Sequence, residues 1–336
     1  MAKELVDDQH AGTEIIERIC IILEKFHASI LQCGLSEQDL IHYLEWFSRN
    51  GYNLAVQYSS KGNALYSMRL LESIIMIMNL YPVGLGPDAL SDIQDRKFWC
   101  RVMAAMVSVT LGRGSNDANA QVTHYTTART NIQLCREYTK IRGHGASQGT
   151  LPSRFKEAWH SLLVLDFEAA IFLRDVGSTQ AILDGCEGLD SKRICMLADL
   201  VISSGQDDVA LYNVFRQIMN MAIRSDTTCQ AIKHFRWLRC LCQLGIKCGA
   251  DCAEFITSKA LELGHGLTSE LGAEMKWLAI AIFNQALDYY IADEMATGRR
   301  WYEEALRLAR GLELEGWDTD SLSTHFTQRS KHLTWD

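Results

Sequence analysis

Proline is scarce in this sequence: 3 prolines occur among 336 residues, at positions 82, 87 and 152. Because proline disrupts the interior of a helix, so few of them leave room for long uninterrupted helices. No apolar run approaches the ~20 residues that a membrane-spanning helix needs. The polar start MAKELVDDQH also lacks the apolar segment of a signal peptide. We therefore expect an intracellular protein whose 11 cysteines are reduced.

Positive charge is in deficit as well. Lysine and arginine number 33 against 41 aspartates and glutamates, which gives a formal net charge of −8. A protein that binds nucleic acid strongly needs clustered basic residues to neutralise phosphates. We therefore expect no strong direct binding of nucleic acid and no association with a membrane.

Apolar residues at helical spacing dominate the stretch 275–310, MKWLAIAIFNQALDYYIADEMATGRRWYEEALRLAR. A polar break at 292–294 divides it into two amphipathic segments, which indicates a helical hairpin. Ala286, Gly298 and Ala305 are small residues at positions where tetratricopeptide repeats bring two helices close together. The pattern therefore favours a hairpin of the tetratricopeptide type.

The same pattern recurs near the start of the chain at an offset of 231 residues, for example from Trp46 to Trp277. One hairpin cannot bury both of its faces, so two of them predict further hairpins between them. The structural repeat positions are Trp46, Asn53, Ala55, Tyr58, Trp277, Asn284, Ala286, Tyr289, Gly298, Tyr302 and Ala305.

Three segments carry a resemblance to a known family. They are HYLEWFSRNGYNLAVQY at 42–58, followed by LYP at 80–82, then RWLRCLCQL at 236–244, and the hairpin 277–310. In this order they resemble the meiotic sporulation and synapsis family of tetratricopeptide proteins, which includes the fungal "sporulation-specific twenty-two" and "Zip-four" proteins. The resemblance spans roughly 41–310. Members are usually much longer, so the chain is similar to the C-terminal part of one, or to a shortened relative.

The remaining sequence divides into helical segments separated by Gly, Ser, Asp and Pro, and none requires a strand. We expect helices over 14–32, 37–59, 64–80, 92–111, 120–141, 153–174, 177–186, 190–204, 207–224, 227–248 and 250–264. The fold class is then all-α, a right-handed α-solenoid of tetratricopeptide-like hairpins. We expect a flexible N-terminus at 1–12, a repeat domain at 13–311, and a tail at 312–336 with a possible capping helix.

Cysteines and histidines are densest between 234 and 265, so a metal site must be considered. The group consists of His234, Cys240, Cys242, Cys248, Cys252 and His265. Zinc ligands usually come in pairs in loops or turns, whereas these cysteines fall within predicted helices. Cysteine also suits close helix packing. We therefore favour packing over metal binding or redox chemistry, and we expect no metal and no cofactor.

Catalytic patterns are weak throughout. A nucleophilic cysteine or serine needs a positioned base, and the sequence singles out no such pair. The acidic pairs at 207–208 and 293–294 lack the further carboxylate of an isoprenoid-type metal motif, and the loops at 112–118 and 143–150 lack the ending of a phosphate-binding loop. We therefore expect no catalytic residues and no enzymatic activity, although an all-helical enzyme is the alternative of a different class.

Large side chains at helical spacing are usually core residues. We place the tryptophans at 46, 159, 237, 277 and 301 in the core rather than at a recognition surface. Asparagine is mildly unfavourable inside a helix unless its side chain finds a partner. Asn53 and Asn284 therefore either brace a neighbouring backbone or contact a bound peptide.

The first helix of a tetratricopeptide hairpin commonly lines a concave groove. By that resemblance the partner-binding positions are Arg49, Tyr52, Val56, Ser59, Ile280, Phe283, Leu287 and Tyr290. This set is mainly apolar and aromatic, so a helix or an extended apolar segment is the best-matched ligand. The function predicted from the sequence is a non-enzymatic scaffold for protein–protein interaction.

The resemblance implies a narrower role. The partners would be synapsis and crossover factors, and the location would be the nucleus, on meiotic chromosomes. A general intracellular tetratricopeptide adaptor without a meiotic role is the alternative.

Overall fold

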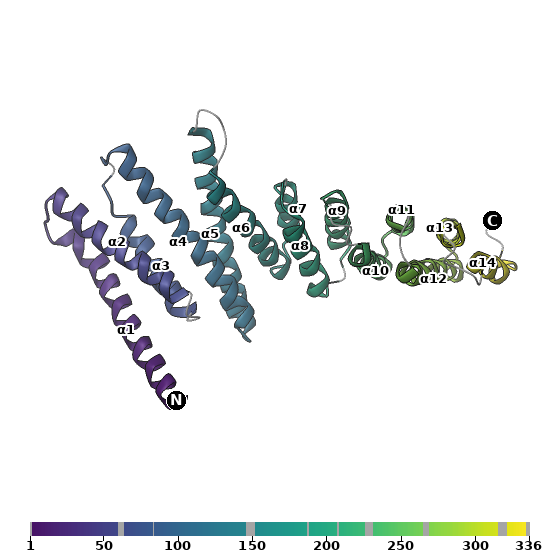
Figure 1. Ribbon diagram of the computed structural model, residues 1–336, viewed down its shortest axis with the longest axis horizontal. Helices are drawn as coiled ribbons and strands as arrows, with labels where there is room; N and C mark the ends of the chain where they lie inside the picture. The colour runs from purple at the N-terminus through teal and green to yellow at the C-terminus, as the bar shows by residue number, and fades with distance from the viewer. Residues whose placement is uncertain are drawn as a thin grey trace. The chain divides into compact units, whose positions relative to one another are not determined.

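The structure is a computed structural model that describes residues 2–59, 64–82, 84–145, 152–186, 188–206, 208–225, 231–264, 269–314 and 321–333. Over these residues the chain is helical and has no β-strand, as Figure 1 shows. The all-α prediction is therefore confirmed, and the right-handed solenoid stays a prediction. Contacts divide the chain into unit 1, Met1–Asp175, and unit 2, Val176–Asp336.

Unit 1 contains six α-helices and one short 3-10 helix over the described residues. They are α1 (Ala2–Ser29), η1 (Ile30–Gln32), α2 (Glu37–Ser59), α3 (Ala64–Met78), α4 (Pro87–Gly114), α5 (Ala118–Gly145) and α6 (Ser153–Phe172). Consecutive helices pack in pairs, α2 with α3 and α4 with α5, while α1 and α4 both contact α3. Apolar side chains from α1 to α4 form one core, in which Leu70, Leu71 and Ile74 of α3 are fully buried. Two further clusters join α4, α5 and α6.

Unit 2 contains eight α-helices over the described residues. They are α7 (Val176–Asp184), α8 (Ser191–Ser204), α9 (Val209–Ser225), α10 (Ala231–Cys248), α11 (Ala253–Gly264), α12 (Ser269–Ile291), α13 (Met295–Leu314) and α14 (Leu322–Ser330). The most extensive contact between two helices of this unit is that of α12 with α13. Helix α10 contacts α12, and α11 contacts α13, so each pair rests on the next along the chain.

Helix ends follow from local sequence. The Asp190 carboxylate accepts a hydrogen bond from the Arg193 backbone N–H at 2.8 Å and caps the start of α8. Gly205 ends the same helix with φ of 62°, a left-handed conformation that glycine adopts without steric cost. Pro87 occupies the first turn of α4, where its missing N–H costs nothing.

Two predicted boundaries differ from the structure. Helix α1 begins at Ala2, so most of the segment 1–12, which was expected to precede the first helix, belongs to it. Helix α4 runs to Gly114, so residues 112–114 of the loop expected at 112–118 are helical. The helix expected near the C-terminus is present as α14, and it packs against α13. None of the described helices combines the length and the apolar character that a membrane span requires.

Candidate functional site

The hairpins α2–α3 and α12–α13 share nine buried positions when they are matched at the offset found in the sequence. The matched buried pairs are Leu44/Met275, Ser48/Ala279, Gly51/Ile282, Ala55/Ala286, Ser67/Gly298, Leu70/Trp301, Ile74/Ala305, Ile77/Leu308 and Met78/Ala309. A shared set of buried positions means that both hairpins present the same face to their neighbours. The two hairpins can therefore be compared position by position to find surfaces that one covers and the other leaves open.

The predicted groove residues of α2 are only partly open. The side chain of Arg49 is 63% exposed but pairs with Glu45 on the same helix. Val56 is 43% exposed, and Tyr52 is half-buried against the core of unit 1. The side chain of Ser59 is not among those that the structure describes. Of the three described positions, Arg49 and Val56 are therefore exposed and Tyr52 is not.

The predicted groove residues of α12 differ more strongly from expectation. Ile280 is 38% exposed, while Leu287 and Tyr290 are half-buried. Phe283 is only 1% exposed, so the prediction that a partner can reach it is wrong. Its ring stacks on Phe326 of α14 with centroids 4.2 Å apart. The C-terminal helix therefore covers this part of α12.

The structural repeat positions are buried, half-buried or exposed. Ala55, Ala286, Gly298 and Ala305 are buried as predicted, and Tyr58, Trp277, Tyr289 and Tyr302 are half-buried. Asn53 and Asn284 are exposed. Neither asparagine therefore belongs to the core, and the choice between bracing a neighbouring backbone and contacting a partner stays open.

Trp46 is the largest departure from the predicted core. The tryptophans at 237 and 301 are buried and those at 159 and 277 half-buried, whereas Trp46 is 57% exposed. Tyr43, one turn earlier on α2, is 45% exposed. The Trp46 ring meets the Phe47 ring edge-on at 4.8 Å, and Phe47 stacks on Phe26 of α1 at 3.9 Å. The exposed aromatic residues are therefore anchored on a packed aromatic contact between two helices.

Helix α1 extends this surface. Ile15, Ile22 and Phe26 are spaced so that they share one face of α1. Ile15 and Ile22 are each 54% exposed, and Phe26 reaches α2 through Phe47. We call the combined set the Trp46 surface; it consists of Ile15, Ile22, Phe26, Tyr43, Trp46 and Phe47. Its exposed members are Ile15, Ile22, Tyr43 and Trp46. Patches of exposed apolar residues are typical of interaction sites on soluble proteins.

The matched residue in the second hairpin shows how such a tryptophan is covered. The Arg239 guanidinium of α10 lies 4.3 Å from the centre of the Trp277 ring. Arg239 also lies 3.7 Å from the Glu274 carboxylate on α12. Helices α10 and α11 contact α12 and α13 respectively, and α1 contacts α3 as α11 contacts α13. Helix α1 thus corresponds to α11, and the described part of unit 1 has no helix in the place of α10.

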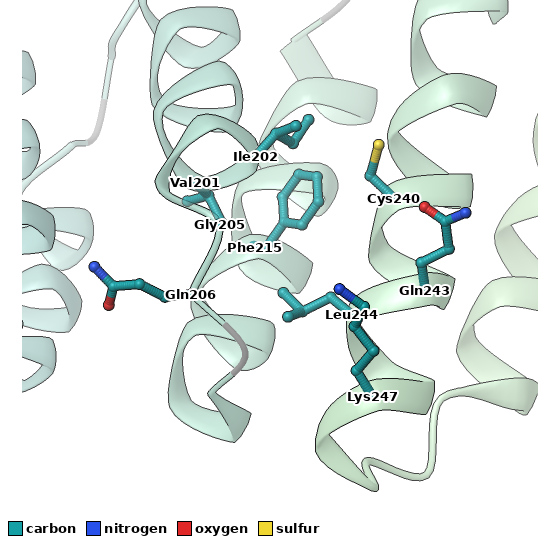
Figure 2. Close-up of a pocket in the computed structure, with 9 residues that line it drawn as sticks. All are labelled: Val201, Ile202, Gly205, Gln206, Phe215, Cys240, Gln243, Leu244 and Lys247. Atoms are coloured by element: carbon teal, nitrogen blue, oxygen red, sulfur yellow. The ribbon is translucent and has the colours of Figure 1, made fainter.

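A cavity of about 160 Å³ lies between α8, α9 and α10. Figure 2 shows Phe215 within its lining, with Gln206 and Lys247 on opposite sides. Cys240 contributes a thiol whose pKa is raised by burial. Among the described lining residues no histidine or carboxylate accompanies this thiol. Cys240 and Lys247 are the titratable residues of this described lining.

Two cysteines of the group, Cys242 and Cys252, lie where α10 meets the residues that directly precede α11. Cys242 and Cys252 are fully buried, and the pKa of the Cys252 thiol is raised by its hydrogen bond with Cys242 and by burial. A Cβ atom added to Gly245 would lie 2.7 Å from the Cys252 sulfur, so the two helices approach closely here. No group of three potential metal ligands occurs among the described residues, and His265 lies outside them.

Thiol reactivity provides a test of this packing. A thiolate is the reactive form, and burial raises the thiol pKa. With iodoacetamide at neutral pH we expect the exposed Cys33 to be alkylated first among the described cysteines, and Cys242 and Cys252 only after unfolding. Mass spectrometry of digests from native and urea-treated protein measures this order. Rapid native labelling of Cys252 would show that the α10–α11 contact is open.

Comparison with known proteins does not assign the chain to a family. No family model matches the chain, and no curated protein matches it. The resemblance to the meiotic sporulation and synapsis family stays a prediction that rests on the three quoted segments.

Proposed function

We propose that the chain is a non-enzymatic scaffold that binds an amphipathic helix of a partner protein on the Trp46 surface. The observation that carries this proposal is the contrast between Trp46, which is 57% exposed, and its matched residue Trp277, which α10 covers. Tryptophan and tyrosine are enriched among the residues that dominate binding energy at protein interfaces. Trp46 and Tyr43 form an exposed pair of such residues on α2, which suits the binding of a partner protein.

The chemistry of the partner follows from the way α10 covers α12. Helix α10 presents an apolar stripe to its neighbours, with Phe235, Leu238 and Leu241 fully buried. It also places a guanidinium over an indole, an arrangement worth about 0.5–2 kcal/mol depending on desolvation. The partner helix is therefore expected to carry apolar residues three and four apart and an arginine or lysine that reaches Trp46.

A phage-displayed library of helical peptides tests the surface and needs no identified partner. Peptides are selected on the wild-type protein, and their affinities are measured against Trp46→Ser. We expect the substitution to weaken binding by about 2 kcal/mol or more, roughly 30-fold. The thermal melt should change little, because more than half of the side chain already lies in solvent.

The matched control is Met196→Ser on α8. It alters an apolar residue of unit 2 that is 44% exposed and does not belong to the Trp46 surface. It should leave the selected peptides bound as tightly as before. Equal affinity for wild type and Trp46→Ser would rule out the Trp46 surface as the binding site. Selected peptides without an apolar stripe would contradict the proposed chemistry of the partner.

The narrower role that we propose is the connection of synapsis and crossover factors on meiotic chromosomes. Its support is the resemblance of the segments 42–58, 236–244 and 277–310 to the meiotic family. Immunoprecipitation from meiotic cells, in parallel with the Trp46→Ser variant, tests it. Recovery of such factors with the wild type and their loss with the variant is the expected result. Uniform expression outside meiosis would favour a general adaptor instead.

A further inference from the structure

Cations that reach into unit 1 are generally paired with carboxylates. Arg96 lies 2.9 Å from Glu45, and Arg129 lies 3.1 Å from Asp166. The same pattern holds for Arg136 with Asp166 and for Arg113 with Glu168. Taking a charge out of water is costly unless an opposite charge compensates it, so this pairing is expected.

Lys97 and Arg101 do not follow the pattern. They are half-buried and lie one turn apart on the same face of α4. Within the described residues neither has a carboxylate at ion-pair distance, and Arg101 makes one long hydrogen bond, 3.5 Å to the Asn131 side-chain oxygen. Burial lowers the pKa of both groups, and the charge of Arg101 lowers the pKa of Lys97 further. Two positive charges are thus held together, and neither forms an ion pair with a carboxylate of the described residues.

Both cations line one cavity of about 260 Å³ between α3, α4 and α5. The described lining consists of Asn79, Gln94, Lys97, Phe98, Arg101, Leu134, Glu137, Tyr138 and Ile141. The amides of Asn79 and Gln94 add neutral hydrogen-bond donors beside the two cations. One wall is apolar, so an anion bound there would be partly shielded from water, which strengthens charge-assisted hydrogen bonds.

The carboxylates near this cavity form no ion pair with Lys97 or Arg101, although the charge of Glu137 raises the pKa of Arg101. Asp95 is occupied, since it accepts a hydrogen bond from the Tyr138 hydroxyl and lies 3.3 Å from Arg154. Glu137 lines the cavity, but its side chain is exposed and accepts a hydrogen bond from Gln133 at 3.4 Å. An exposed carboxylate is screened by water and attracts the cations weakly.

We propose that Lys97 and Arg101 form a binding site for a phosphate monoester. The dianion of a phosphate monoester carries about −1.5 to −2 charges near neutral pH, which matches two cations better than a single carboxylate does. The guanidinium of Arg101 donates two parallel hydrogen bonds to phosphate oxygens, and the ammonium of Lys97 contributes a point charge. The phosphate belongs either to a phosphorylated side chain of a partner protein or to a small phosphorylated molecule.

Isothermal titration of the full chain with inorganic phosphate tests the site, with sodium chloride at equal ionic strength as the reference. We expect phosphate to bind, and Lys97→Met and Arg101→Gln each to weaken it about ten-fold or more, as for a lost charge-assisted hydrogen bond. Glu137→Gln should strengthen binding, because it removes the negative charge from the cavity. The matched control Lys140→Gln, on the exposed side of α5, should leave binding unchanged.

The melting temperature in phosphate-free buffer gives a second readout. Lys97→Met retains most of the side-chain length and removes the repulsion between the two cations, so it should melt at or above the wild-type temperature. A phosphoserine peptide and adenosine monophosphate then distinguish the two sources, since the true source should bind more tightly than inorganic phosphate. Heat effects that chloride reproduces, or phosphate affinity that survives both cation substitutions, would overturn the proposal.

Discussion

Replacing Trp301 with alanine is expected to lower the free energy of unfolding by about 3–5 kcal/mol, the range for large aromatic residues in a core. Trp301 is fully buried in α13, and its indole N–H donates a hydrogen bond to the Asp251 carboxylate at 3.1 Å. Asp251 lies just before α11, so this one side chain fixes α13 against the start of α11. Urea unfolding followed by circular dichroism measures the loss.

Two variants make that measurement specific. Trp301→Phe retains most of the apolar volume but removes the indole N–H, so it should cost clearly less than the alanine substitution. Trp46→Ala removes the same side chain from a surface and is expected to change the free energy of unfolding by less than about 1 kcal/mol. Equal losses for Trp301→Ala and Trp46→Ala would mean that the burial assigned to the two tryptophans is wrong.

Local structure was largely predictable from the sequence. The helix expected over 37–59 is α2, Glu37–Ser59, because its apolar period and its flanking turn residues both lie within a short stretch of chain. The small residues Ala286 and Ala305 are buried as predicted, since close helix contact selects for small side chains within a hairpin. Both kinds of signal are carried by neighbours in sequence.

Burial that depends on distant segments was not predictable in the same way. Phe283 is buried because Phe326 of α14 stacks on it. Trp46 is exposed because no described helix of unit 1 packs over its ring as α10 packs over Trp277. Asp166 and Glu168 are buried in α6 because arginines of α4 and α5 reach them. No periodicity within one helix reports which other helix will cover it, so the sequence identified Trp46 as a repeat position but placed it wrongly in the core.

The two proposed sites differ in what they require of a partner. The Trp46 surface is apolar and needs a helix that buries aromatic rings, and its energy comes from removing apolar area from water. The cavity at Lys97 and Arg101 needs an anion, and its energy falls with added salt to the extent that solvent reaches it. Binding at the Trp46 surface should therefore tolerate salt, while phosphate binding should weaken. A partner that engages both would carry an apolar helix and a phosphorylated residue.

The match between the two hairpins predicts a reciprocal exchange of side chains. In α2–α3 the small residue is Gly51 and the large one is Ile74, and a Cβ atom added to Gly51 would lie 2.8 Å from the Ile74 side chain. The matched positions in α12–α13 are Ile282 and Ala305, both fully buried. The same space between two helices is thus filled from opposite sides, from α3 in one hairpin and from α12 in the other.

Ile74→Ala alone leaves a cavity and is expected to cost about 2–5 kcal/mol. Gly51→Ile alone overpacks the contact and is expected to cost about 1–3 kcal/mol or more. The double variant recreates the arrangement of the second hairpin. Its loss in free energy of unfolding should therefore be smaller than the sum of the losses of the two single variants. A double-mutant cycle from urea unfolding is expected to give a favourable coupling of about 1–3 kcal/mol.

The control pairs Gly51→Ile with Ile77→Ala, which empties a buried position of α3 one turn further along. Its cavity lies away from the new isoleucine, so the two losses should add with little coupling. Rescue by Ile74→Ala but not by Ile77→Ala would establish that the hairpins share one packing register. Additive losses in both pairs would show that Gly51 and Ile74 do not fill the same space. The match between the two hairpins, and with it the match of Trp46 to Trp277, would then be wrong.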